Sequence, residues 1–142
     1  MRVAVIREPG LAPAMRRAVS SAGIAALLRR CGDMLDVPPR ASLGVRLTGD
    51  AELHALNLRF AGVAAPTDVL AFPADEPGRV GDVAISVERA AAQAHDAVTE
   101  LRLLAVHGLL HCLGRNHDNS ADAAAMTALS RRLLPEQDVP DL

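Results

Sequence analysis

Hydrophobic and polar positions alternate in several short stretches of the chain, which is the pattern of half-buried β-strands. In the clearest of them, residues 41–48, three apolar side chains alternate with serine, glycine and arginine. The other stretches are rich in valine, isoleucine or leucine, and those at residues 2–7 and 67–73 are closed by proline. The four strands predicted in this way are residues 2–7, 41–48, 67–73 and 81–86.

Between and after these strands, apolar residues recur every three or four positions, which predicts amphipathic helices. The predicted helices are residues 13–30, 50–60, 87–114 and 120–134. Gly32 is expected to stop the first helix and Asp50 to cap the second. The third is long for a globular protein, so we expect a break near residues 96–99, with Thr99 capping its second half.

The order of these elements predicts an α+β fold. Strands and helices follow one another as β, α, β, α, β, β, α, α, which favours a mixed sheet of about four strands with four or five helices. The chain has 142 residues, half of them hydrophobic. That length is typical of one domain, here residues 1–142, and is enough for a core without disulfides or a structural metal.

Composition limits the partners and the compartment. The formal net charge is −2 and the 15 basic residues are all arginine, so a nucleic acid would be attracted by a local patch or a metal rather than by a global field. Cys31 and Cys112 form no CxxC pair, and a reducing cytoplasm is expected. No apolar run reaches the ~18 residues of a membrane span, and the N-terminus has no signal-peptide pattern. We therefore expect a cytoplasmic protein without a membrane partner.

Three of the five histidines fall within residues 107–118. His107 and His111 are four residues apart, which places both on one face of a helix. Gly114 would let the chain turn, so that His117 can return to the same side. Three imidazoles are the ligand set of a catalytic zinc site that keeps one position for water. The spacing therefore predicts one Zn²⁺ bound by His107, His111 and His117.

The spacing H-x3-H-x2-G-x2-H matches the zinc ligands of metzincin proteases, with one decisive departure. Gly108 stands where a protease needs the glutamate that serves as general base, so a peptidase mechanism is not expected. A glycine here would instead leave room beside the metal for a larger substrate group. Cys112 follows a ligand by one helical position and points about 100° away; we expect it to be a small buried residue.

Several blocks of the sequence resemble the YbeY family, bacterial metal-dependent endoribonucleases of ribosomal RNA maturation. Residues 107–117, HGLLHCLGRNH, are similar to the family's H-G-x-L-H-L-x-G-Y-D-H. Residues 56–62, LNLRFAG, resemble L-N-x-x-Y-R-G, and residues 66–73, PTDVLAFP, resemble P-T-[DN]-V-L-S-F-P. Residues 81–85, GDVAI, are similar to G-D-[IL]-x-I. The resemblance covers about residues 40–134, in order and with fitting gaps.

The resemblance implies a zinc-hydrolase-like fold and a zinc-dependent, single-strand-specific endoribonuclease. It implies that His107, His111 and His117 bind the zinc ion. The expected partners are ribosomal RNA precursors and the ribosome or its assembly proteins, with no DNA. No catalytic side chain follows with certainty from the sequence, because either water or the RNA 2′-hydroxyl can be the nucleophile.

The chain departs from the family at positions that bear on RNA. The family's arginine in Y-R-G is Ala61, and Arg59 lies two residues away, about 200° around a helix. The family's serine in V-L-S-F-P is Ala71, and the Tyr-Asp pair is Arg115-Asn116. Arg115 is the tentative catalytic residue, as a cation for phosphate beside the metal; the alternative is a solvated arginine in a turn.

Three carboxylates have two open interpretations each. Asp68 and Asp82 stand at strand starts, where each either faces the site or closes a local turn. Asp118 either orients a ligand imidazole or caps the last helix. His54 and His95 are isolated in predicted helices and are expected at the surface.

Two other functions remain open on the sequence alone. Ala61 and Ala71 motivate the first, a catalytically weakened, metal-containing module that binds during ribosome assembly. The second is a zinc hydrolase of another substrate, against which Gly108 argues only for peptides. The nuclease interpretation accounts for more of the chain than either.

Overall fold

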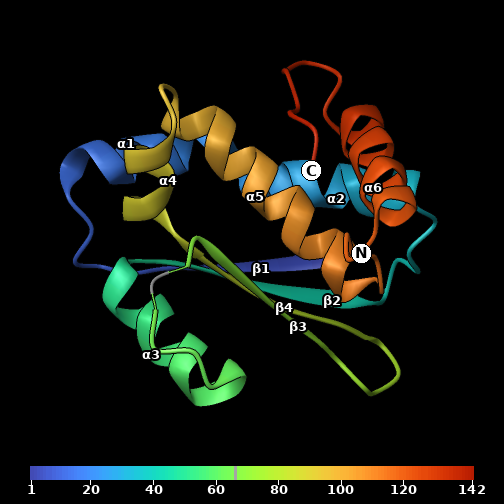
Figure 1. Ribbon diagram of the computed structural model, residues 1–142, viewed down its shortest axis with the longest axis horizontal. Coiled ribbons are helices and arrows are strands. Elements are labelled where there is room, and N and C mark those ends of the chain that lie inside the picture. Colours follow the sequence, from blue (N-terminus) through green and yellow to red (C-terminus); the bar gives the residue numbers. More distant parts are fainter. Residues whose placement is uncertain (66) are drawn as a thin grey trace.

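A four-stranded mixed sheet forms the centre of the computed structural model, which describes residues 1–65 and 67–142 (Figure 1). The strand order is β1-β2-β4-β3, in which β1, β2 and β4 are parallel and β3 runs antiparallel to β4. The α+β fold with a mixed four-stranded sheet is therefore confirmed. The strands are β1 (Arg2–Arg7), β2 (Ser42–Thr48), β3 (Val69–Pro73) and β4 (Arg79–Ser86).

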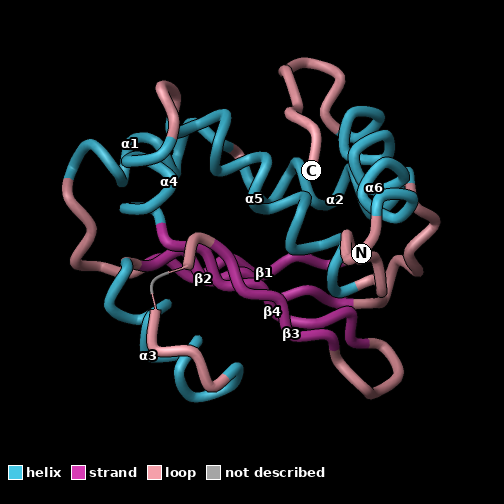
Figure 2. The backbone as a smooth tube through the Cα atoms, viewed as in Figure 1, coloured by secondary structure: helices cyan, strands magenta, loops and turns pink. Residues whose placement is uncertain are grey.

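Helices cover the two faces of the sheet unequally. Figures 1 and 2 show α5 lying across one face with α1, α2, α4 and α6 around it, while α3 lies on the other side. The helices are α1 (Pro13–Ala22), α2 (Ile24–Met34), α3 (Asp50–Ala61), α4 (Val87–Gln93), α5 (Ala97–Cys112) and α6 (Ser120–Leu133). None of the helices in residues 1–65 and 67–142 is both long enough and apolar enough for a membrane span.

The core lies between the sheet and α5. The apolar residues of β2 that the alternation predicts to be inside, Leu43, Val45 and Leu47, are at most 2% exposed. Leu101 and Leu109 of α5 are fully buried in the same apolar core. Because α5 is apolar on nearly all sides, it is the central helix of the domain.

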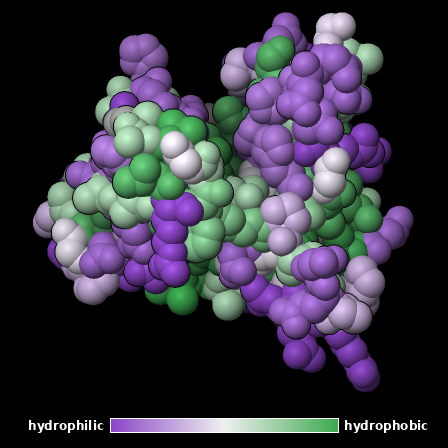
Figure 3. Space-filling view, turned by 60° about the horizontal axis from the view of Figure 1, so that its bottom comes forward, coloured by the Kyte–Doolittle hydropathy of each residue, from purple (hydrophilic) through white to green (hydrophobic). Residues whose placement is uncertain are grey.

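The less covered face of the sheet exposes apolar side chains. Figure 3 is turned toward this side, and hydrophobic residues gather there between hydrophilic ones. Ile6 of β1 is 58% exposed and Phe60 of α3 is 59% exposed. Phe60 packs edge-on against Phe72 of β3, with ring centroids 5.3 Å apart. These aromatic rings attach α3 to the edge of the sheet.

The predicted helix 13–30 is two helices. Gly23 adopts the left-handed conformation at φ 59° and separates α1 from α2, because glycine has no Cβ to oppose that conformation. Gly32 was expected to end the helix, which is wrong: α2 continues to Met34. Gly32 is buried against Met1 instead.

Two predicted helix caps are also wrong. Gly49, not Asp50, is the N-cap of α3, and the Asp50 carboxylate accepts a hydrogen bond from Ser86 Oγ at 2.6 Å. The break before α5 is where it was expected, but Asp96 caps the helix by accepting from the backbone N–H of Val98. Thr99 donates its hydroxyl to the same carboxylate.

Candidate metal centre

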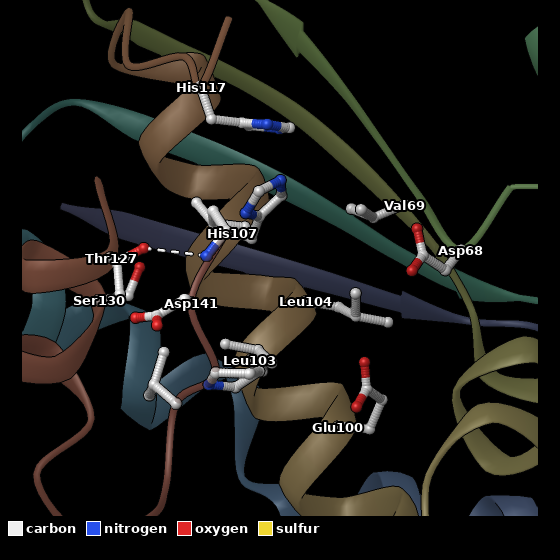
Figure 4. A pocket seen from close by; sticks show the side chains of 13 residues that line it. Asp68, Val69, Glu100, Leu103, Leu104, His107, His117, Thr127, Ser130 and Asp141 are labelled. Atoms are coloured by element: carbon white, nitrogen blue, oxygen red, sulfur yellow. Dashed lines mark hydrogen bonds between the residues drawn. The ribbon is translucent and has the colours of Figure 1, made fainter. Parts of the chain in front are cut away.

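The three histidines of the sequence motif come together at the end of α5. His107 and His111 occupy successive turns of the helix, which ends at Cys112. Gly114 then takes φ +90°, a conformation that side chains rarely adopt, and reverses the chain. His117 returns from the following turn, so that nitrogen atoms of all three imidazoles lie within 4.8 Å of one another. Figure 4 shows His117 above His107, beside a cavity.

The rings are packed closely. Nε2 of His107 and Nε2 of His111 are 3.0 Å apart. Ring centroids are 4.5 Å apart for His107 and His111, and about an ångström further for each of these with His117. Three nitrogens that face one point are the donor set that a tetrahedral zinc ion with one open position requires. The residues therefore fit a metal ion.

Burial keeps the imidazoles in the form that binds metals. Burial, together with the neighbouring His111 and His117, lowers the pKa of His107 to about 4. The pKa of His111 is lowered as well, first by burial and then by His117. Both rings are neutral at pH 7, so protons do not compete strongly for their lone pairs.

Two neighbours of His117 act on His111. The backbone of Arg115 and the Asp118 carboxylate both favour the protonated ring, so they raise the pKa of His111 and oppose the effect of burial. Capping of α6 by Asp118 is wrong, because Asn119 accepts the N-cap hydrogen bond from Asp122. The Arg115 side chain is exposed.

Gly108 does not make room for substrate, which corrects the expectation from the sequence. A Cβ built on it would lie 2.5 Å from Cγ1 and 3.0 Å from Cγ2 of Val83, and 3.4 Å from Cγ2 of Val69. The space beside this glycine is filled by the sheet. Glycine here lets α5 approach β4 closely, and a glutamate would have no space.

Cys112 lies on the sheet side of α5, as expected for a small buried residue. It is 8% exposed, and its Sγ is 3.8 Å from the carbonyl oxygen of Asp82. Burial raises the pKa of its thiol to about 11. The protonated thiol is a poor metal ligand.

Of the other residues considered in the sequence, some lie at this site and some lie elsewhere. Asp68 lines the cavity beside His107, whereas Asp82 is exposed and pairs with Arg79 at 2.9 Å, so it closes local structure. His54 and His95 are exposed, as expected. Residue 66 of the PTDVLAFP block lies outside the described residues.

Sequence reasoning missed most of the cavity, which has a volume of about 240 Å³. Glu100, Leu103 and Leu104 line it from α5, Thr127 and Ser130 from α6, and residues 139–142 close one side. Glu100 stands seven residues before His107, which is two helical turns along the same face. That spacing could have placed Glu100 at the site from the sequence alone. Nothing in the sequence indicated that residues 139–142 line the cavity.

Comparisons with known proteins agree with this architecture. The family model described as Endoribonuclease YbeY matches residues 15–137. An Endoribonuclease YbeY of Chloroflexus aggregans is 39% identical over 82% of this chain and 89% of its own. One from Chloroflexus aurantiacus is 41% identical over 69% of this chain and 74% of its own.

A solved structure shares the fold. The solution structure of TM1509 from Thermotoga maritima matches with a TM-score of 0.51 and 21% identity, covering 94% of this chain and 90% of that one. The fold and the three-histidine cluster thus define an α+β protein with a candidate metal centre. The chain belongs to the endoribonuclease YbeY family, whose members hydrolyse phosphodiester bonds in RNA.

Proposed function

We propose that this protein is a zinc-dependent endoribonuclease that cuts single-stranded RNA during the maturation of ribosomal RNA. His107, His111 and His117 hold one zinc ion. Residues 1–142 act as one hydrolase domain in the cytoplasm, on ribosomal RNA precursors and with the ribosome or its assembly proteins. The observation that carries the proposal is the convergence of three imidazoles within 4.8 Å in a chain of the YbeY endoribonuclease family.

The side chains around the metal have separate tasks. When bound, a zinc ion supplies Lewis acidity toward water and phosphoryl oxygen. Leu104 and Val69 form an apolar wall of the cavity beside His107. The exposed guanidinium of Arg115 supplies positive charge for a phosphate. The lack of space at Gly108 argues against a protease-type glutamate and hence against peptide hydrolysis.

Metal content and RNA cleavage test the proposal together. The purified protein should contain one zinc ion per chain by elemental analysis, and His111→Ala or His117→Ala should lose most of it. The zinc-loaded protein should cut a single-stranded RNA oligonucleotide and leave its duplex intact. The matched control is His95→Ala, which removes an exposed imidazole and should change neither result. Equal zinc in the wild type and His117→Ala would overturn the proposed ligands.

One structural observation favours the second candidate, a module with weakened cleavage. Ala61 is exposed at the last position of α3, where the family motif has an arginine. The guanidinium of Arg59 lies 5.0 Å from the centre of the Phe60 ring, so this arginine is engaged on its own helix. Restoring an arginine at Ala61 distinguishes the two candidates, as described in the Discussion.

A further inference from the structure

The cavity beside the histidines is lined mainly by apolar and hydrogen-bond-accepting groups. Val69 and Leu104 form an apolar wall next to His107 (Figure 4). Its volume of about 240 Å³ is just below the range of roughly 300–1,000 Å³ for sites of drug-sized ligands, so it suits a smaller, flat group. Residues 139–142 close the far side, where the backbone N–H of Leu142 donates to Thr127 Oγ1 at 3.1 Å.

Two carboxylates face one end of this cavity and are held by one amide. Gln93 Nε2 donates to Asp68 Oδ2 at 2.9 Å and to Glu100 Oε1 at 3.0 Å. Figure 4 shows Asp68 and Glu100 on the same side of the cavity, opposite Ser130. Each carboxylate has a second oxygen for an incoming donor, since a carboxylate offers about four lone-pair sites.

A buried hydroxyl marks the opposite wall. Ser130 is 3% exposed and lines the cavity. Within the described residues its Oγ has no protein hydrogen-bond partner, yet no fully buried side-chain oxygen there is left unpaired. The Ser130 hydroxyl therefore reaches the cavity surface and is available to a ligand.

These groups do not suit a phosphate. Among the described residues no arginine lines the cavity, and Asp141 is already paired with Arg131 at 2.8 Å. Carboxylates at Asp68 and Glu100 repel an anion and accept hydrogen bonds from N–H donors. The favoured occupant is a flat, uncharged ring with adjacent N–H groups.

We propose that this cavity binds a guanine base of the RNA next to the cleaved bond, with Glu100 as the residue that selects it. Guanine presents two adjacent donors, N1–H and the exocyclic N2 amine, which match one carboxylate. Adenine and cytosine place an acceptor nitrogen beside their amine, and uracil places its single N–H between two carbonyls. Proteins that recognise single-stranded RNA usually bind unstacked bases through hydrogen bonds to their Watson–Crick edge, where these donors lie. The proposal rests on the proposed nuclease function.

Nucleotide binding tests the base site without relying on cleavage. The probes are GMP and IMP, which carry the same phosphate and differ by the N2 amine. GMP should bind about five- to 150-fold more tightly than IMP, the range for a two-point hydrogen-bonded base contact, and shift the backbone amide signals of Glu100 and Ser130. Glu100→Gln should bind GMP and IMP with equal affinity, and Ser130→Ala should bind both nucleotides more weakly than the wild type. Glu76→Gln, which removes an exposed carboxylate in a loop, is the matched control.

Cleavage gives an independent measurement. Single-stranded oligonucleotides with guanine or inosine at one position should differ in kcat/KM for the wild type and not for Glu100→Gln. Equal binding of GMP and IMP, or an unchanged ratio in Glu100→Gln, would overturn the base site. Failure of the nuclease proposal would give a different result. In that case His111→Ala would cleave RNA as the wild type does, while the preference for GMP over IMP would persist.

Discussion

A Cβ placed on Gly108 would lie 2.5 Å from Cγ1 of Val83, closer than such atoms approach in proteins. This relationship joins the helix that carries His107 and His111 to the sheet, because Gly108 follows His107 and Val83 is central in β4. Gly108, the glycine of the histidine motif, therefore serves the packing of α5 on the sheet. The height of α5 above the sheet, and hence the position of His107 and His111, depends on it.

Gly108→Ala should therefore destabilise the protein, although alanine is the better helix former by about 1 kcal/mol. Val83 is 1% exposed and cannot move away, so we expect a net loss of about 1–3 kcal/mol in the free energy of unfolding, as for other overpacked cores. Urea unfolding measures it. Adding Val83→Ala should recover part of the loss, and strictly additive losses in the double mutant would contradict the contact.

Arg115 should act through its side chain on RNA and through its backbone on His111. Arg115→Ala removes the exposed guanidinium and leaves in place the backbone that raises the pKa of His111. Zinc content should stay at the wild-type level, while KM for single-stranded RNA rises about 10- to 150-fold, the order of a charge-assisted hydrogen bond. Arg115→Lys should restore part of the loss. A drop in zinc content in Arg115→Ala would show that the side chain serves the metal centre instead.

Restoring the family arginine at Ala61 should increase RNA cleavage. Position 61 is exposed at the end of α3, so the substitution should leave the unfolding midpoint unchanged within error. The expected gain is about tenfold in kcat/KM on single-stranded RNA, from a guanidinium–phosphate contact. Cleavage that appears only in Ala61→Arg would favour the assembly-module function for the natural chain. Ala64→Arg, at an exposed position in the next loop, is the control for added charge.

Alkaline pH should destabilise the fold through Cys31. This thiol is fully buried, and burial raises its pKa from 9.0 to about 11. Above pH 9 the unfolded chain loses the proton while the folded protein keeps it, so stability falls as the pH rises from about 9 to about 11. The expected loss is about 1–3 kcal/mol.

The chain has no tyrosine and its basic residues are all arginine, so the main other group that titrates in this interval is the thiol of Cys112, whose pKa burial raises in the same way. Urea midpoints at pH 8 and 10.5 measure the loss. Cys31→Ala, although less stable at every pH, should show a smaller decrease between these values. An identical decrease in both proteins would exclude Cys31 as its source.

Local patterns were enough for the strands and for most helix positions. Alternation along residues 41–48 identified the buried side of β2, because neighbouring strand residues face opposite sides of the sheet. The errors were at helix ends, where competing local groups decide. Asp96 was preferred to Thr99 as a cap, and Gly23 divided a helix that periodicity alone joined.

By itself the sequence determined the three histidines, since the spacing in residues 107–117 and the geometry of a helix bring two of them onto one face. It also determined the family resemblance that the comparisons confirmed. Only the tertiary structure decided the roles of Gly108 and Asp82 and the composition of the cavity. Those depend on how segments far apart in the chain pack: β4 against α5, and residues 139–142 along the cavity that His107 and His117 also line. Such contacts follow from how the elements pack, which no local pattern records.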